Sequence, residues 1–495
     1  MSDFLDSLPE VFVSNTDISA SVYQAVDQGK VKKIGSRLYT KNLQDDPDII
    51  VKRNWFHLLK EYYPDALIAD RTAIENKPSE DGSVFLISSK KRKTELPGII
   101  FNPRKGYPPL ESDRDFIDGI KLSSIPRAFL ENIKESRARS GVARTLNKKE
   151  VEESLDTYLR RRGEDALNKL RDEALKISKE LEMGNEYKKL DELIGGLFGT
   201  RDTEVISDTA KARKEGLPFD PDRLEVFDEL FRKLKETAPL IRSSIDVSQK
   251  EKTNLAFFEA YFSNFIEGTE FEVEEAADII FNNAIPAERP EDAHDILGTY
   301  RIVSNYEEMS EVPENFEHFL ELLKRRHSAF MEFRPDKNPG EFKKKANVAG
   351  ATHFVAPDLV VGTLKKGFEI YQGLEEPFHK AVYMMFLVSE VHPFTDGNGR
   401  AARIMMNSEL VAAKEQKIII PTIYRSNYLS ALKALTQSQL ASPIIRTLDF
   451  AQKYTQSSDW STYDNAMADL KDTNAFMDPA IADNEGIRLR IPNGN

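Results

Sequence analysis

The segment that most constrains the fold is the apolar run AVYMMFLVSEV, residues 381–391, which leads directly into the polar sequence HPFTDGNGRAAR. The run is apolar enough for a buried helix, and Pro393 discourages that helix from continuing. His392 is therefore expected at a helix end, and a second helix is expected to begin near Asn398 or Gly399. The loop between them is either a solvated turn or a phosphate-binding catalytic loop.

The residues of this loop combine groups that bind phosphates. Gly397, Asn398 and Gly399 can adopt backbone conformations in which amides converge on an anion, and the following helix adds its positive N-terminal end. Arg400 and Arg403 are three residues apart, so they share a helix face and can both reach a polyphosphate. Together these features favour a site for a nucleotide.

The same loop also offers a base and a metal ligand. A histidine ordinarily titrates near neutrality, so His392 is suited to act as general base for a hydroxyl nucleophile. Asp396 is a hard oxygen ligand suited to Mg²⁺, and Phe394 is expected to point into the core. Each residue alone also fits a structural role, as a helix end, a turn or a solvated arginine. Their coincidence in one loop favours metal-assisted attack on a nucleotide.

Composition excludes several other classes of function. The chain has no cysteine, which excludes disulfides, thiolate metal sites and cysteine nucleophiles and agrees with a reducing compartment. The net charge of -13 argues against a polyanion-binding surface over the whole chain. The start, MSDFLDSLPE, lacks the basic and apolar regions of a signal peptide, and no apolar run is long enough to cross a bilayer. We therefore expect a soluble cytoplasmic protein with no membrane partner.

Four regions are expected along the chain. They are residues 1–111, 112–216, 217–455 and 456–495. In the first, DISASVYQAVDQG predicts a short helix, KVKKIGSRLYT predicts a hairpin that turns at Gly35-Ser36, and SVFLISS predicts a further strand, so a small α+β domain resembling a winged helix is expected. The second region is highly charged and predicts a helical connector domain. The last predicts a polar tail that is loosely ordered in part.

The third region predicts a mostly helical domain. Its first helix is expected to be capped by Asp220 and to open with Pro221. One exception to the helical pattern is ANVAGATHFVAPDLV, whose small and β-favouring residues predict a short hairpin or an extended flap. The fold class predicted for the whole chain is mainly α.

The sequence HPFTDGNGRAAR resembles the signature of Fic domains, HxFx(D/E)GNGRxxR, with every constrained position present. The resemblance covers roughly residues 220–455 and implies an all-helical Fic core with a β-hairpin flap. It also implies protein AMPylation, the transfer of AMP from Mg-ATP to a Ser, Thr or Tyr hydroxyl of a target protein with release of pyrophosphate.

The resemblance also implies a role for each residue of the loop. It makes His392 the base and Asp396 the metal ligand, and it assigns residues 397–399 to the anion hole. Arg400 would bind the inner phosphates and Arg403 the γ-phosphate. The last glycine of the hole favours AMP transfer over phosphotransfer, because the related Doc kinases have a lysine there and bind the nucleotide reversed.

A second resemblance lies upstream, in SNFIEG. Ser263 and Glu267 are one helical turn apart and Gly268 is suited to end a helix, which alone would fit an exposed glutamate beside a helix end. The segment resembles the Fic inhibitory motif (S/T)xxxE(G/N), which implies a class II, self-inhibited protein with its inhibitory helix near residues 250–268. Glu267 and the γ-phosphate would compete for Arg403. In some members of the family this glutamate positions a water that removes AMP, so the reverse reaction is also expected.

The flap and the adenine site are marked less completely. GATHFVAPD resembles the family hairpin that clamps the target by strand addition and borders the nucleotide, which implicates Thr352, His353 and Phe354. His353 fits an exposed loop residue equally well. RSNYLSALKALT resembles the helix near adenine, with Tyr428 in a matching aromatic place. It departs from many relatives, which carry a second aromatic at Leu429 and an asparagine at Thr436, so the contacts to the base stay undefined.

The N-terminal region resembles the winged helix of abortive-infection antitoxins, through GKVKKIGSRLYT and YYPDALIADRTAI. Such a domain would bind DNA phosphates through Lys32, Lys33 and Arg37, or would serve only to dock a protein. The first hypothesis is thus a self-inhibited adenylyltransferase. The alternative is a DNA-binding transcriptional regulator or antitoxin-like protein whose Fic core mainly senses nucleotide. The target protein and the oligomeric state stay open, with a homodimer among the alternatives.

Overall fold

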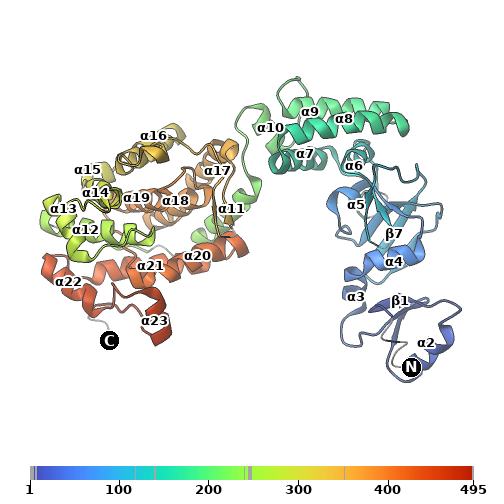
Figure 1. Ribbon diagram of the computed structural model, residues 1–495, viewed down its shortest axis with the longest axis horizontal. Helices are drawn as coiled ribbons and strands as arrows, with labels where there is room; N and C mark the ends of the chain where they lie inside the picture. The colour runs from blue at the N-terminus through green and yellow to red at the C-terminus, as the bar shows by residue number, and fades with distance from the viewer. Residues whose placement is uncertain are drawn as a thin grey trace. The chain divides into compact units, whose positions relative to one another are not determined.

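The computed structural model describes residues 5, 8–117, 119–138, 141–238, 240–243, 248–350 and 352–492. The chain separates into two compact units, Met1–Gly216 and Leu217–Asn495 (Figure 1). The division falls inside the segment KEGLPFDPDR. Among the described residues, none of the helices has both the length and the apolar character needed to cross a membrane.

The first unit opens with a small sheet next to a short helix. The predicted hairpin is present: β2 (Lys32–Gly35) pairs antiparallel with β3 (Leu38–Thr40), and β1 (Val11–Val13) pairs with the other edge of β3. The helix α2 (Ser19–Asp27) buries Val22 and Ala25 against this sheet. Two further helices follow, α3 (Pro47–Arg53) and α4 (Trp55–Tyr62).

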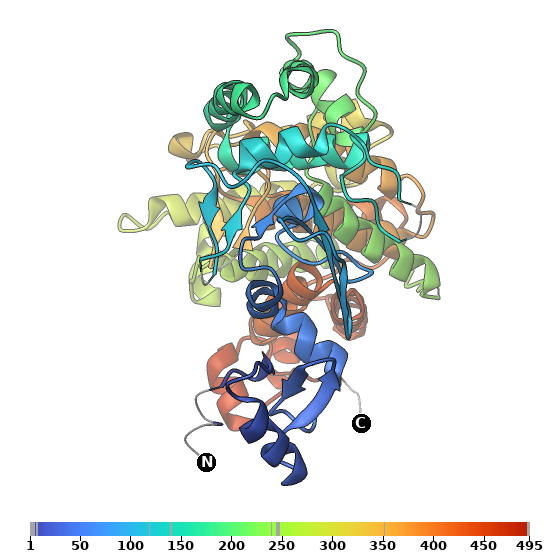
Figure 2. The ribbon, with the colours of Figure 1, turned by 90° about the vertical axis from the view of Figure 1, so that its right-hand side faces the viewer.

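A second sheet of six strands forms the middle of this unit (Figure 2). Its order is β6-β7-β5-β4-β9-β8, with the bounds β4 (Leu67–Ile68), β5 (Ser83–Ile87), β6 (Thr94–Leu96), β7 (Ile99–Arg104), β8 (Arg114–Asp115) and β9 (Lys121–Leu122). The expected domain boundary at 111/112 is wrong, because strands on both sides of it belong to this sheet: β9 pairs in parallel with β4, and β8 pairs with β9. Strands of two residues are too short to show the alternating pattern that reveals a strand in a sequence.

The remaining helices of the first unit follow the six-stranded sheet in the chain, except α5, which lies between β4 and β5. Their bounds are α5 (Asp70–Glu75), α6 (Ile125–Asn132), α7 (Lys148–Arg162), α8 (Glu164–Glu180), α9 (Gly184–Leu197) and α10 (Asp208–Lys214). The charged sequence from α7 onward is helical as predicted. Its helices bury an apolar stripe, including Leu155, Leu170 and Leu190, in a core that they share with Phe129 and Leu130 of α6.

The second unit is mainly helical. Its elements are α11 (Pro221–Glu236), α12 (Gln249–Ile266), α13 (Val273–Asn282), α14 (Pro290–Val303), α15 (Tyr306–Met309), α16 (Phe316–Phe330), η1 (Pro335–Lys337), β10 (Val348–Ala349), β11 (Thr352–His353), η2 (Pro357–Leu359), α17 (Val360–Tyr371), α18 (Pro377–Val391), α19 (Asn398–Ala412), η3 (Thr422–Tyr424), α20 (Arg425–Ser438), α21 (Ser442–Ser457), α22 (Tyr463–Asp472) and α23 (Pro479–Glu485). Asp220 caps α11 as predicted, because its carboxylate accepts the Asp222 N–H at 3.1 Å. The predicted hairpin is the pair β10 and β11.

The centre of this unit is the helix pair α18 and α19, which Figure 1 shows surrounded by the other helices. Residues 381–388 of α18 are completely buried, as the apolar run predicts. The helix packs against α11 and α17, for example where Phe386 meets Phe227 edge-on at 6.0 Å. A fully buried helix is fixed in place, and so is the loop that follows it.

The C-terminal region differs from the expected loose tail. Beyond 456 the chain forms α22 and α23, and Trp460 and Phe476 pack against the aromatic face of α12. The indole N–H of Trp460 donates to the Thr455 carbonyl at 2.8 Å, and its own carbonyl accepts from the Asn254 amide at 2.9 Å. The polar composition of the segment reflects its outer face, whereas its few apolar residues cover α12.

Candidate active site

His392 ends α18 in a left-handed backbone conformation with φ 53°. Pro393 disfavours the helical conformation for the residue before it, and Phe394, fully buried, anchors the chain just beyond the turn. The imidazole Nδ1 lies 3.2 Å from the Ser389 carbonyl. A carbonyl only accepts, so Nδ1 carries the proton and Nε2 keeps its lone pair.

The imidazole of His392 is neutral at ordinary pH. Burial lowers its pKa to about 4, assisted by the charge of Lys343 and against the effect of the bond to Ser389. One face of the ring stacks on Phe354 from the flap at 3.7 Å between centroids, and the residue remains partly exposed. An accessible imidazole with a free Nε2 can accept a proton from a hydroxyl.

The loop after His392 turns as predicted and starts α19 at Asn398. Gly397 has φ +74°, and a Cβ there would lie 2.9 Å from Phe330 and 3.1 Å from Met331, so only glycine fits. The Asn398 side chain points into the loop, accepting from the Phe394 N–H at 2.8 Å and donating to its carbonyl at 2.9 Å. Asn398 therefore shapes the loop with its side chain and can offer only its backbone amide to an anion.

Asp396 is exposed at the rim of the loop. One of its carboxylate oxygens accepts the Gly397 N–H at 2.7 Å. In the part of the chain that the structure describes, no three histidine or acidic side chains gather into a metal cage. A single exposed carboxylate fits Mg²⁺, which is commonly held by one or two carboxylates while phosphates and water complete its shell.

The two arginines of the loop are buried on α19 and anchored by different helices. Arg400 pairs with Asp295 of α14 at 3.0 Å, and its guanidinium lies over the Phe330 ring. The Nε of Arg403 donates to the Ser263 hydroxyl at 3.0 Å, and one Nη donates to the Ser263 carbonyl at 2.8 Å. The sequence did not point to Asp295, since only the packing of α14 against α19 brings it near.

Glu267 meets Arg403 although 136 residues separate them in the chain. The helix α12 ends at Ile266, Gly268 has φ +92°, and the Glu267 carboxylate accepts from Arg403 at 2.7 Å. The predicted contact is therefore present. Because Ser263 and Glu267 together take three bonds from Arg403, an added anion would have to displace the carboxylate.

Gly399 makes room for that carboxylate. It is helical, with no positive φ, and a Cβ built on it would lie 2.1 Å from one Glu267 oxygen and 2.8 Å from the carboxyl carbon. Real Cβ atoms do not approach this closely. An alanine at 399 therefore cannot coexist with Glu267 in its present position.

This geometry predicts that Gly399→Ala changes the free energy of unfolding in opposite directions with and without Glu267. With Glu267 present, Gly399→Ala should lower the free energy of unfolding, because the carboxylate must give up a charge-assisted bond of about 1.5–3 kcal/mol. In a Glu267→Gly background the same change should be neutral or should stabilise by up to about 1 kcal/mol, since alanine favours a helix. Denaturant unfolding of the four variants measures this. Equal effects in both backgrounds would contradict the steric account.

The flap lies over His392 and is attached to α11. Thr352 is partly exposed and His353 is exposed, while Phe354 stacks on His392. One Nη of Arg223 donates to the His353 carbonyl at 2.5 Å and the other to Glu390 of α18 at 2.5 Å. The sequence missed Arg223, which joins the flap to α18.

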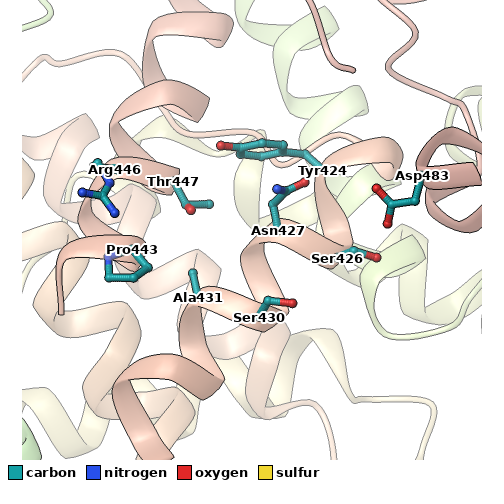
Figure 3. A pocket seen from close by; sticks show the side chains of 9 residues that line it. All are labelled: Tyr424, Ser426, Asn427, Ser430, Ala431, Pro443, Arg446, Thr447 and Asp483. Carbon is teal, nitrogen blue, oxygen red and sulfur yellow. The ribbon is translucent and has the colours of Figure 1, made fainter. Parts of the chain in front are cut away.

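The predicted aromatic residue of α20 lies deeper than expected. Tyr428 is completely buried, its hydroxyl lies 3.2 Å from the Met385 sulfur, and burial raises its pKa. It therefore packs beneath Arg403 rather than facing open space. A pocket of about 480 Å³ lies along a different face of α20 (Figure 3). It is lined by Asn427, Arg446 and other polar residues, and by none of the residues predicted for the site.

The residues predicted to bind DNA belong to the first unit. Lys32 and Lys33 are exposed on β2. Arg37 occupies the hairpin turn with φ 60°, and its Nε donates to the Ser14 carbonyl at 2.8 Å. Two lysines thus face solvent freely, whereas the arginine also stabilises the turn.

Comparison with known proteins finds similarity to Fic proteins. The sequence profile of the Fic/DOC family matches residues 313–410. The protein adenylyltransferase Fic of Drosophila mojavensis is 24% identical over 270 residues, which are 53% of this chain and 52% of that protein. The corresponding protein of Drosophila virilis is 31% identical over 132 residues, 25% of this chain and 27% of that one. The chain spans about half the length of the first of these relatives. A solved structure, a Fic domain containing signaling protein from Bacteroides thetaiotaomicron, is 19% identical with a TM-score of 0.35, covering 48% of this chain and 98% of that one.

Proposed function

Residues 313–410 form a Fic domain, and from this premise we propose that the protein is a self-inhibited protein adenylyltransferase. It transfers AMP from Mg-ATP to a Ser, Thr or Tyr hydroxyl of a target protein. The observation that carries the proposal is the loop between α18 and α19. It holds a neutral imidazole with a free Nε2 next to a glycine-rich helix start and two buried arginines.

The proposed reaction is a displacement at the α-phosphorus of ATP. The target hydroxyl oxygen bonds to that phosphorus, the bond to the bridging oxygen of pyrophosphate breaks, and the hydroxyl proton passes to Nε2 of His392. The N–H groups at the start of α19 and the guanidinium groups of Arg400 and Arg403 bind phosphate oxygens. Asp396 would hold Mg²⁺, which offsets charge on the phosphates.

Glu267 supplies the proposed inhibition. Its carboxylate occupies Arg403, and the γ-phosphate needs the same guanidinium to align the nucleotide. The two states compete, so removal of the carboxylate shifts the population towards the reactive arrangement. The proposal includes the reverse reaction, in which Glu267 would hold the water that releases AMP from a modified target.

The reaction class is tested with two labels. The Glu267→Gly protein, mixed with Mg²⁺ and a cell lysate, should label protein from α-labelled ATP and not from γ-labelled ATP. Label from γ-labelled ATP would indicate phosphotransfer instead, and no label from either nucleotide would refute a transferase. Labelled protein, purified and returned to the wild-type enzyme, should lose its AMP if the reverse reaction operates, and should keep it with Glu267→Gly.

A second candidate function is suggested by the exposed Lys32 and Lys33 on the N-terminal hairpin. In it the protein is a DNA-binding regulator or antitoxin-like protein, and the Fic core senses nucleotide. A mobility shift with the upstream region of its own gene tests this. Binding should weaken steeply with salt, and changing both lysines to glutamate should abolish it. Unchanged binding by that variant would exclude the hairpin as the contact.

A further inference from the structure

His327 is a buried histidine that the proposed reaction does not use. It lies on α16, on the same face as Phe319, Leu323 and Phe330, and is completely buried. One ring nitrogen has its partner in the loop between α18 and α19, and the other has its partner in the segment that follows η1. Nε2 lies 2.9 Å from the Asp396 carbonyl, and Nδ1 lies 2.9 Å from the Gly340 nitrogen.

These partners determine which nitrogen carries the proton. The Gly340 N–H can only donate, so Nδ1 must accept and has no proton. The Asp396 carbonyl can only accept, so Nε2 donates its proton there. A protonated ring would have to give up the bond from the Gly340 N–H, because Nδ1 accepts that bond. The ring is therefore a neutral donor aimed at the catalytic loop.

The bond to Asp396 orients the peptide group that opens the anion-binding turn. In a planar trans peptide the carbonyl and the N–H point in opposite directions. Because the Asp396 carbonyl faces His327, the Gly397 N–H faces away from it, where it meets the Asp396 carboxylate at 2.7 Å. Rotation of this peptide would remove the N–H from the side on which the exposed carboxylate lies.

The ring itself has little freedom. It stacks on Phe394 of the loop with centroids 3.6 Å apart and planes 6° apart, and Phe330 contacts it edge-on at 5.3 Å. The backbone of Gly397 also lies close to the ring, since a Cβ built on Gly397 would lie 3.3 Å from Nε2 of His327. Stacking thus fixes the ring plane in which both hydrogen bonds can form.

We infer that His327 is a positioning residue, which holds the Asp396-Gly397 peptide so that the Gly397 amide stays on the side of the Asp396 carboxylate, where the proposed reaction places the nucleotide phosphates and their metal ion. The inference rests on the proposed function, because it takes the loop to be the phosphate site. His327 does not touch the reacting atoms. It acts through the peptide of the loop, and the bond to the Asp396 carbonyl is the part that matters.

Replacing His327 with glutamine or with asparagine distinguishes the bond to the Asp396 carbonyl from the bond from the Gly340 N–H. A glutamine amide can place its N–H near the position of Nε2 and keep the bond to Asp396. An asparagine oxygen lies near the position of Nδ1, where it keeps the bond from Gly340 and loses the one to Asp396. Both replace an aromatic ring, so the loss of stacking is common to them. His379 is a buried histidine elsewhere on α18, and His379→Asn serves as the matched control.

The test measures ATP binding by calorimetry and the steady-state constants, all in full-length Glu267→Gly protein. His327→Asn should raise Kd and KM for ATP about tenfold, the effect of losing one hydrogen bond. His327→Gln should recover most of this affinity at a similar melting temperature. His379→Asn should lower the melting temperature and leave Kd unchanged. Equal losses of affinity in the asparagine and glutamine variants would overturn the inference.

A second measurement determines the protonated nitrogen of His327 in the parent protein and uses a variant only to assign the signal. Nitrogen NMR of histidine-labelled parent protein should show one imidazole protonated only at Nε2 whose signal disappears in His327→Gln. A proton on Nδ1 would overturn the inference. Failure of the proposed function is distinguishable from either result. If the parent binds ATP but transfers no AMP, the transferase proposal fails while the Kd comparison still decides the role of His327.

Discussion

Replacing Glu267 with glycine should raise AMP labelling by about 10- to 100-fold. The carboxylate holds Arg403 through a charge-assisted hydrogen bond at 2.7 Å, and such bonds contribute about 1.5–3 kcal/mol. A free-energy difference of this size changes the ratio of the inhibited to the active population by about 10- to 100-fold. The initial rate of label incorporation from α-labelled ATP measures the effect. Saturating ATP should not reproduce it, because bound nucleotide without Arg403 lacks its alignment.

A matched control is available for this prediction. Glu270 lies three residues further on, is exposed, and belongs to the same acidic segment. Glu270→Gly changes the net charge and the chain stiffness in the same way and should leave the rate near that of the wild type. If both variants were activated equally, loosening of the segment rather than release of Arg403 would be the cause.

Replacing His392 with alanine in the activated Glu267→Gly protein should reduce the rate by about 10²- to 10⁴-fold, the contribution usual for a general base. The loss should appear in kcat, with the affinity for ATP nearly unchanged, because the imidazole acts on the target hydroxyl. His318→Ala serves as control, since His318 lies at the start of α16 and pairs with Glu311. Full activity without His392 would remove it from the reaction.

The lowered pKa of His392 predicts how the rate of AMP transfer depends on pH. Its pKa is lowered to about 4, so the ring stays an unprotonated base from neutral pH down to about pH 5. The rate should fall only as the pH drops through about 4, where the ring takes up a proton. An acidic limb near pH 6.5, the ordinary value for histidine, would show that the ring is not buried during the reaction. The pH profile of kcat measures this.

Glu267 and Gly399 depend on each other sterically. The glutamate can reach Arg403 only because residue 399 has no side chain, so the glycine at the helix start also makes room for the Glu267 carboxylate. This links two features that the sequence presents separately, a loop after α18 and the end of α12. A substitution at either position is expected to alter the same equilibrium.

Much of the site was predictable because it is local. The helix end at His392, the left-handed Gly397 and the helix start at Asn398 follow from Pro393 and the glycines of one short segment. The same holds for the cap at Asp220 and the flap hairpin. Missed features were those with weak local patterns: the two-residue strands β8 and β9, and the short helices beyond 456 that cover α12.

The sequence by itself determined the groups that the candidate site offers: a histidine at a helix end, a glycine-rich helix start and two arginines that share a helix face. The resemblance of SNFIEG to the inhibitory motif implied the contact of Glu267 with Arg403, and only the tertiary structure decided the other contacts between distant segments. Packing of α12, α14 and α16 against α19 and its loop brought Glu267 to Arg403, Asp295 to Arg400 and His327 to the Asp396 carbonyl. Residue order specifies bonds within a few residues of one another. Contacts between segments far apart in the chain depend on how whole helices pack, which no short pattern encodes.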